Sequence, residues 1–176
     1  KEIAVKKGFK KIQNSIYKLD GEKIFLIHFL IVNSEKLIYS MEVKKKSFDE
    51  IFWKTLRMEE NINERFSLRV NGAFAAPAVE VSEGKCELSE DIEEIAESFM
   101  DKVCEEIEKF QANKDVVECI FSSENMVDED ILKFLAYMDM GKISEAKEFA
   151  YQQVQIGNKG RFINLGKGFF EWALTE

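Results

Sequence analysis

The stretch Lys23–Val32, with the sequence KIFLIHFLIV, decides the fold of this chain. Its apolar residues follow one another with only His28 among them, so both faces of an extended segment would be apolar. A strand of that kind belongs at the centre of a sheet. The run Ile24–Val32 is nine residues long, well short of the roughly 20 that a membrane-spanning helix needs. We therefore predict a central β-strand and no membrane span.

Turn signals on both sides of this strand predict an antiparallel β-meander. Asp20-Gly21 is a typical tight-turn pair, which joins the central strand to an expected strand over Phe9–Leu19. A polar triplet at 33–35 predicts the next turn. From Leu37 to Val43 the residues alternate in polarity, as they do in a strand with one buried face.

The chain from 47 to 81 predicts one helix, one more strand and a loop. Ser47 and Glu50 have the spacing of a capping box, so we expect a helix over 48–59. Arg65–Val70 alternates polar and apolar residues, which favours a strand. The segment 73–78 contains the only proline, which cannot donate to a sheet ladder. We expect a loop there and a return to the sheet at 79–81.

From Ser89 onward the apolar residues recur at 3–4 spacing, which is typical of amphipathic helices. The expected helices cover about 89–110, 115–121, 128–140, 143–156 and 164 to the end, and 128–156 predicts a single αα-hairpin. Strands first and helices afterwards favour an α+β fold, with an antiparallel β-meander sheet in the N-terminal half packed against a helix-rich C-terminal half. We expect a single domain over 1–176, mainly sheet plus one helix over 1–88 and helical over 89–176.

Charge is divided unevenly along the chain. Residues 1–46 hold 11 lysines and 5 acids, whereas 89–140 hold 4 lysines and 16 acids. Acids recur along the long helix opposite its apolar stripe, and Glu94, Glu97 and Asp101 have the least compensation from nearby lysines. We expect these three to contact a cationic protein partner. The alternatives are a solvated face, or ion pairs with the lysine-rich opening strands.

Trp53 and Arg57 are a second candidate contact for a partner. On the expected helix, Trp53 lies off the apolar stripe and four residues before Arg57, so the two side chains can stack. An exposed tryptophan of this kind is typical of interface hot spots. The alternative is that a second packing layer buries Trp53.

No catalytic signature emerges from the residues that usually carry one. His28 is the only histidine and lies within the apolar run, so we expect a structural or surface role for it. The three cysteines, at 86, 104 and 119, lack the short pair spacing of a zinc site. The glycine-rich segment Gly157–Arg161 lacks the P-loop order, which favours an interhelical turn over an anion site. We expect no catalytic residue, no cofactor and no metal.

The composition indicates which kinds of partner and which cellular compartment to expect. The net charge of -8 argues against nucleic acid as a partner, despite the basic opening. Three cysteines without a redox or disulfide spacing favour a reducing compartment, so we expect the cytoplasm. Lys1 is not an initiator methionine, so we expect the chain to begin inside a longer one or after processing.

The opening also carries a resemblance. Gly8-Phe9-Lys10-Lys11, followed by Ile16-Tyr17 and the apolar strand at 24–32, resembles a bacterial domain family of unknown function that begins with a helix, a Gly-Phe step and a β-meander. Some similar small domains act as immunity proteins against secreted toxins. The resemblance implies a non-catalytic, acidic protein-binding domain that blocks a cationic partner. The alternative is an enzyme or small-ligand-binding domain with a pocket between the sheet and the helical half.

Overall fold

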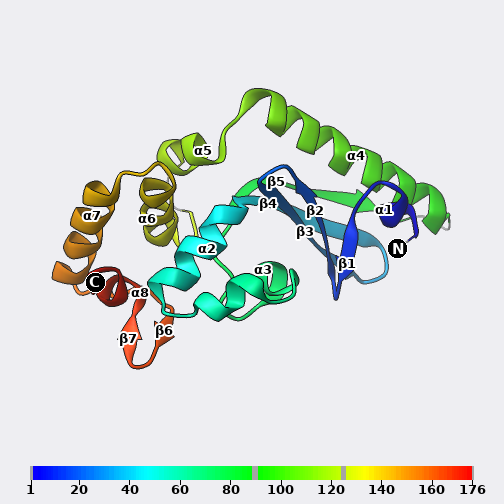
Figure 1. Ribbon diagram of the computed structural model, residues 1–176. Coiled ribbons are helices and arrows are strands. Elements are labelled where there is room, and N and C mark those ends of the chain that lie inside the picture. The colour runs from blue at the N-terminus through cyan, green and yellow to red at the C-terminus, as the bar shows by residue number, and fades with distance from the viewer. Residues whose placement is uncertain (1, 89–90, 124–125, 176) are drawn as a thin grey trace. The chain divides into compact units, whose positions relative to one another are not determined.

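The computed structural model describes residues 2–88, 91–123 and 126–175. The chain forms two compact units: the first comprises the chain up to Lys44 together with Val79–Glu118, and the second comprises Lys45–Ala78 together with the chain from Cys119 onward. A five-stranded antiparallel sheet lies in the N-terminal half and helices predominate in the C-terminal half, which confirms the α+β fold (Figure 1). The expected single domain stays a prediction.

The sheet of the first unit is a meander in which the strands follow one another in chain order. Its strands are β1 (Lys10–Ile12), β2 (Ser15–Asp20), β3 (Lys23–Val32), β4 (Lys36–Lys45) and β5 (Val79–Glu87). The apolar stretch forms the middle strand β3, as predicted. The single strand expected over Phe9–Leu19 is wrong, because a turn at Gln13, where φ is +50°, folds it into the β1–β2 hairpin.

Two helices of the first unit lie against the sheet. They are α1 (Glu2–Lys6), which packs on α4 as well as on β1, and the long α4 (Ile92–Asn113) (Figure 1). Phe25 and Phe29 of β3 contact Phe110 and Phe99 of α4 edge to face, at centroid distances of 6.0 and 6.3 Å. Because successive strand residues point to opposite faces, the odd-numbered residues of β3 face α4 and His28 lies on the other face.

The second unit is mostly helical. Its elements are α2 (Lys46–Thr55), the 3-10 helix η1 (Glu59–Asn63), α3 (Leu68–Asn71), α6 (Glu129–Asp139), α7 (Ile143–Gln155), β6 (Ile163–Asn164), β7 (Lys167–Gly168) and α8 (Phe169–Ala173), and α5 (Val116–Ser122) runs from the first unit into it. The expected αα-hairpin is formed by α6 and α7. Phenylalanines build much of the core: Phe52 stacks on Phe169 at 5.2 Å, and Phe134 meets Phe169 edge to face at 5.2 Å.

Three sequence predictions for the second unit are wrong. Ser47 does not cap α2: its hydroxyl donates to Asp139 Oδ1 at 2.5 Å, and the helix starts at Lys46, two residues before the expected start at 48. Arg65–Val70 is not a strand, because Leu68 begins the short helix α3. The helix expected from 164 is only α8, preceded by the β6–β7 hairpin. In each case a tertiary contact or a turn overrides a local pattern.

Candidate functional site

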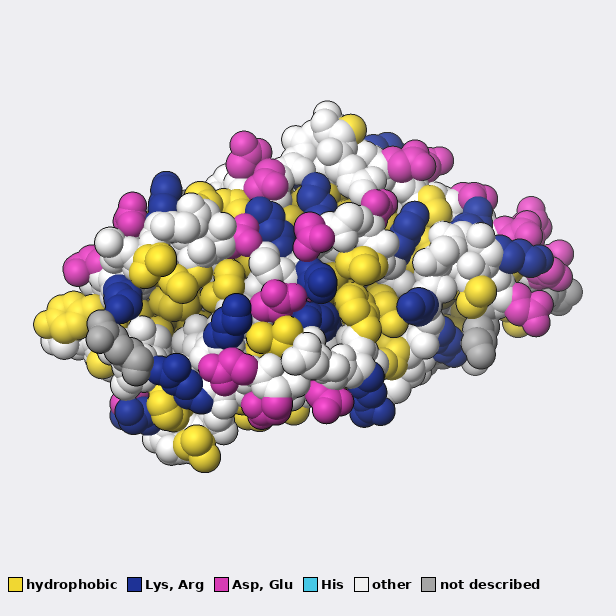
Figure 2. Space-filling view, viewed as in Figure 1, with side chains coloured by type: hydrophobic (Ala, Val, Ile, Leu, Met, Phe, Trp, Pro, Cys, Tyr) yellow, Lys and Arg dark blue, Asp and Glu magenta, His cyan; other side chains and the backbone are white. Residues whose placement is uncertain are grey.

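Helix α4 presents acidic side chains on its outer face. Glu94 and Glu97 are exposed, and no ion pair of the described residues includes either of them. Other exposed acids on this helix are Glu93, Asp101, Glu105 and Glu108. Acidic side chains gather around the start of α4 (right in Figure 2). We call Glu94 and Glu97 the acidic pair of α4.

Asp101 differs from the acidic pair because it forms an ion pair with Lys7 within the first unit, whereas Glu97 acts on Lys7 only through its charge, without an ion pair. Lys7, just after α1, donates a hydrogen bond to the Asp101 carboxylate. This bond raises the pKa of Lys7 above its ordinary value, against a smaller lowering by burial. For Asp101 the structure therefore shows an internal ion pair with a lysine of the basic opening segment.

Hydrogen bonds from the sheet to Glu106 hold α4 on the sheet. The Tyr39 hydroxyl donates to Glu106 Oε1 at 2.8 Å, and the Ser82 hydroxyl donates to Glu106 Oε2 at 2.9 Å. Lys102 lies 5.2 Å from the centre of the Tyr39 ring. Burial raises the pKa of Tyr39, and the contact with Tyr39 raises the pKa of Lys102. The side chains that hold the inner face of α4 are thus distinct from the acidic pair outside.

An apolar pocket of about 330 Å³ lies between this inner face and the sheet. All of its lining residues belong to the first unit. They come from α1, from strands β1 to β4, from α4 and from Leu88, and the central ones include Ile16, Phe29, Ile95 and Phe99. Of the described residues that line the pocket, Lys11 alone has a polar side chain. Sequence periodicity could not reveal this cavity, because it predicts which faces are apolar and not how closely they meet.

Trp53 and Arg57 have separate surroundings in the second unit. Trp53 is 1% exposed, and its Nε1–H donates to the Phe74 carbonyl oxygen at 2.5 Å. Arg57 is exposed, lies 5.9 Å from the centre of the Trp172 ring, and donates to the Thr175 carbonyl oxygen at 2.9 Å. Trp53 is therefore a core residue, as the alternative in the sequence analysis expected.

The expected stacking of Arg57 on Trp53 is wrong. Helix α2 ends at Thr55 and Arg57 has φ of +59°, so the two residues are not one helical turn apart. The guanidinium of Arg69 takes that place, 4.8 Å from the centre of the Trp53 ring. Arg69 is itself 4% exposed and lies 3.9 Å from a carboxylate oxygen of the buried Asp49. No local pattern indicates this buried ion pair, because the alternation over Arg65–Val70 predicts a strand there.

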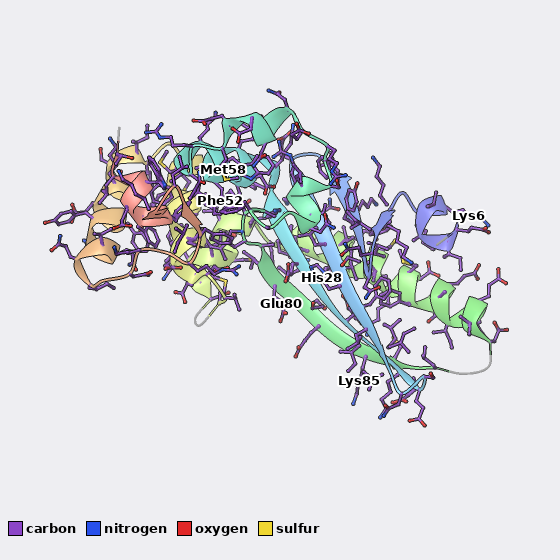
Figure 3. All side chains as sticks on the ribbon, turned by 90° about the horizontal axis from the view of Figure 1, so that it is seen from below. Lys6, His28, Phe52, Met58, Glu80 and Lys85 are labelled. Carbon is purple, nitrogen blue, oxygen red and sulfur yellow. The ribbon has the colours of Figure 1, made fainter. Side chains whose placement is uncertain are left out.

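His28 joins two polar side chains on neighbouring strands, a cluster that sequence analysis missed. Ser15 Oγ lies 2.8 Å from His28 Nδ1, and Glu42 Oε2 lies 3.4 Å from His28 Nε2. The hydrogen bond to Glu42 raises the pKa of His28, and burial opposes it. Figure 3 shows His28 on β3. With 41% of its side chain exposed, His28 can gain a proton from solvent without leaving this site.

The glycine-rich segment 157–161 uses its charged groups internally. Lys159 Nζ lies 2.8 Å from Glu171 Oε1, and Arg161 forms two hydrogen bonds of 2.7 Å with the Asp128 carboxylate. The bond from Lys159 lowers the pKa of Glu171. Both cations are therefore paired within the second unit, and the segment connects α7 to β6.

Cys86, Cys104 and Cys119 are not joined in disulfide bonds. Within the ranges that the structure describes, no group of three or more His, Cys, Asp or Glu side chains is arranged to hold a metal ion. None of the described helices combines the length and the apolar character needed to cross a membrane. No family model, curated protein or solved structure matches the chain.

Proposed function

We propose that this chain is a non-catalytic protein-binding domain and that the acidic pair of α4 contacts a cationic partner. The observation that carries the proposal is the contrast along one helix: Asp101 is paired with Lys7, whereas Glu94 and Glu97 are exposed and have no ion-pair partner among the described residues. Neighbouring like charges destabilise a helix slightly. Opposite charge on a partner would relieve that cost, speed encounter and orient the complex.

We also propose a biological setting for the domain, the bacterial cytoplasm. In keeping with the resemblance of its opening segment, the domain would act as an immunity-type protein in the bacterial cytoplasm, where it would cover the active site of a cationic toxin. Arg57 of the second unit is a separate candidate contact, because it is exposed. Asp101 and the buried Trp53 would act indirectly, Asp101 by holding Lys7 and Trp53 by packing the second unit.

Charge-matched variants test the protein-binding proposal. The double variant Glu94→Gln/Glu97→Gln and the control Glu59→Gln/Glu60→Gln each remove two exposed acids. Proteins captured from the source cell by the wild-type domain are then bound to each form at rising salt concentrations. The α4 variant should associate several-fold more slowly and show a flatter salt dependence, whereas the control should behave as wild type. Equal behaviour of the two variants would contradict the proposal.

A second candidate function is the binding of a small apolar ligand. The observation that favours it is the pocket of about 330 Å³ between the sheet and α4. Its volume is at the lower end of the range of roughly 300–1,000 Å³ that is typical of ligand sites, and it is mainly apolar as such sites are. Replacement of Ala96, a small lining residue on α4, by Phe should fill the cavity. A ligand that raises the melting temperature of the wild type should therefore not raise that of a folded Ala96→Phe variant. Equal stabilisation of both proteins would contradict a role for this pocket.

A further inference from the structure

We propose that the pocket binds a single-chain aliphatic ligand with an anionic head group, and that Lys11 pairs with that head group. This inference rests on the second candidate function, small-ligand binding, and names the ligand class. The volume of about 330 Å³ is about twice the roughly 150 Å³ cavity that holds one benzene ring in an engineered protein. The pocket therefore has room for more than a single small ring.

The lining indicates an extended ligand. Lys11 on β1, Ile16 on β2, Phe29 on β3 and Leu37 on β4 all border the pocket. These four strands are consecutive neighbours in the sheet. At about 4.8 Å between neighbouring strands, the pocket extends over roughly 14 Å across the sheet. A flexible hydrocarbon chain fits a narrow apolar space of that length between a helix and a sheet.

The position of Lys11 indicates the head group. Lys11 pairs with Ile16 across the β1–β2 hairpin, so it lies on the face of the sheet that borders the pocket. Its side chain is exposed, and among the described residues no acid lies within ion-pair distance of it. Lys7, by contrast, is paired with Asp101. A carboxylate at the pocket mouth would give Lys11 a counter-ion while the aliphatic chain remains in the apolar interior.

Apolar side chains with unusual exposure also border the pocket. Ile92 on α4 is 73% exposed and Ile31 on β3 is 55% exposed. Single exposed apolar residues are common on proteins. Here both line the same cavity, so a bound chain would remove part of both from water. This arrangement favours an aliphatic ligand over a purely polar one.

The test compares two ligands of equal chain length, decanoate and decanol, below their aggregation concentrations and at a pH where decanoate is ionised. Binding to the whole protein is measured by calorimetry, and chemical shifts of the Ile16 and Ile95 methyl groups report the site. Lys11→Gln is the test variant. Lys10→Gln is the matched control, because Lys10 is the adjacent lysine and, by strand alternation, lies on the other face.

The wild type should bind decanoate about two- to fivefold more tightly than decanol, as expected for one solvent-accessible ion pair. Lys11→Gln should abolish this preference without weakening decanol binding, and Lys10→Gln should keep it. The head-group assignment would be overturned if the wild type bound decanol and decanoate equally. It would also be overturned if Lys10→Gln lost the preference as Lys11→Gln does. Either result would leave small-ligand binding in place. Absence of binding by either ligand, or methyl shifts confined to isoleucines that do not line the pocket, would overturn both.

Discussion

The hydroxyl of Tyr39 donates a 2.8 Å hydrogen bond to Glu106 Oε1, which joins β4 to α4 across 67 positions of sequence. The other oxygen of the same carboxylate, Glu106 Oε2, accepts a hydrogen bond from Ser82 of β5. These bonds fix the height and the rotation of α4 over the sheet. The pocket beneath α4 and the acidic pair on its outer face both depend on that placement.

Removing the Tyr39 hydroxyl should therefore destabilise the first unit. Tyr39→Phe keeps the ring contact with Phe99, at a centroid distance of 5.2 Å, and removes only the donor to Glu106. We expect a loss of about 1–2 kcal/mol in the free energy of unfolding, because Glu106 remains partly buried with one fewer donor. Urea denaturation followed by circular dichroism measures it. Tyr151→Phe, at a tyrosine that is 51% exposed, is the control and should be close to neutral.

Gly84 of β5 should not accept a side chain. A Cβ atom there would lie 2.8 Å from the Tyr39 ring and hydroxyl, closer than non-bonded atoms approach. Gly84→Ala should lower the free energy of unfolding by about 1–3 kcal/mol, the usual cost of overpacking. Lys85→Ala, at the exposed neighbouring position, should not. Equal denaturation midpoints for the two variants would show that Tyr39 can move aside without cost.

The cluster around His28 predicts a pH dependence of stability. Because Glu42 raises the pKa of His28 above 6.5, the protonated imidazole stabilises the native state. That contribution is fully present below the unfolded pKa of 6.5 and is lost as the pH rises through the higher folded pKa. Glu42→Gln should lower the folded pKa and reduce the loss of stability between about pH 6 and pH 8.

Proton NMR can follow this titration directly, because the chain has a single histidine. Glu83→Gln is a suitable control, since Glu83 pairs with Ser40 on the neighbouring strand and is not a partner of His28. A His28 pKa that is the same in the wild type and in Glu42→Gln would contradict the assignment of Glu42 as the cause.

Fluorescence should distinguish the two tryptophans. In a Trp172→Phe background, Trp53 should emit at short wavelength and resist quenching by acrylamide, since it is 1% exposed. In a Trp53→Phe background, the half-buried Trp172 should be more accessible to the quencher. Red-shifted, readily quenched emission from Trp53 in a folded monomer would restore it as a candidate surface contact.

Neutralising different acids of α4 should have different effects on the stability of the protein. Asp101→Asn should lower stability, because it removes the negative charge that pairs with Lys7 and leaves only a neutral amide oxygen as acceptor. Glu94→Gln/Glu97→Gln should leave stability unchanged or raise it by about 0.2–0.5 kcal/mol through relief of like-charge repulsion. Thermal denaturation at low salt checks both. A destabilised Glu94→Gln/Glu97→Gln variant would indicate an internal partner and would contradict the proposed binding role of the pair.

The sequence by itself determined the arrangement of elements with strong local signals. The doubly apolar run at Lys23–Val32 predicted the central strand, and Asp20-Gly21 predicted the turn before it, where Gly21 has φ of +58°. Repeated 3–4 spacing predicted α4, α6 and α7. These signals are local because period and turn chemistry are properties of neighbouring residues. They also placed Glu94 and Glu97 on the outer face of α4.

Only the tertiary structure decided which side chains meet across long stretches of chain. Trp53 lies off the apolar stripe of α2, and the segment at Phe74 supplies the acceptor of its indole N–H. Asp101 and Lys7 are 94 positions apart, so their pairing leaves no local signal. The pocket beside Lys11 exists because α1, the sheet and α4 meet at a particular distance. The hydrophobic period of a helix or strand predicts that one of its faces is buried. Which residues pack against that face, and how large a cavity remains between them, depends on tertiary packing.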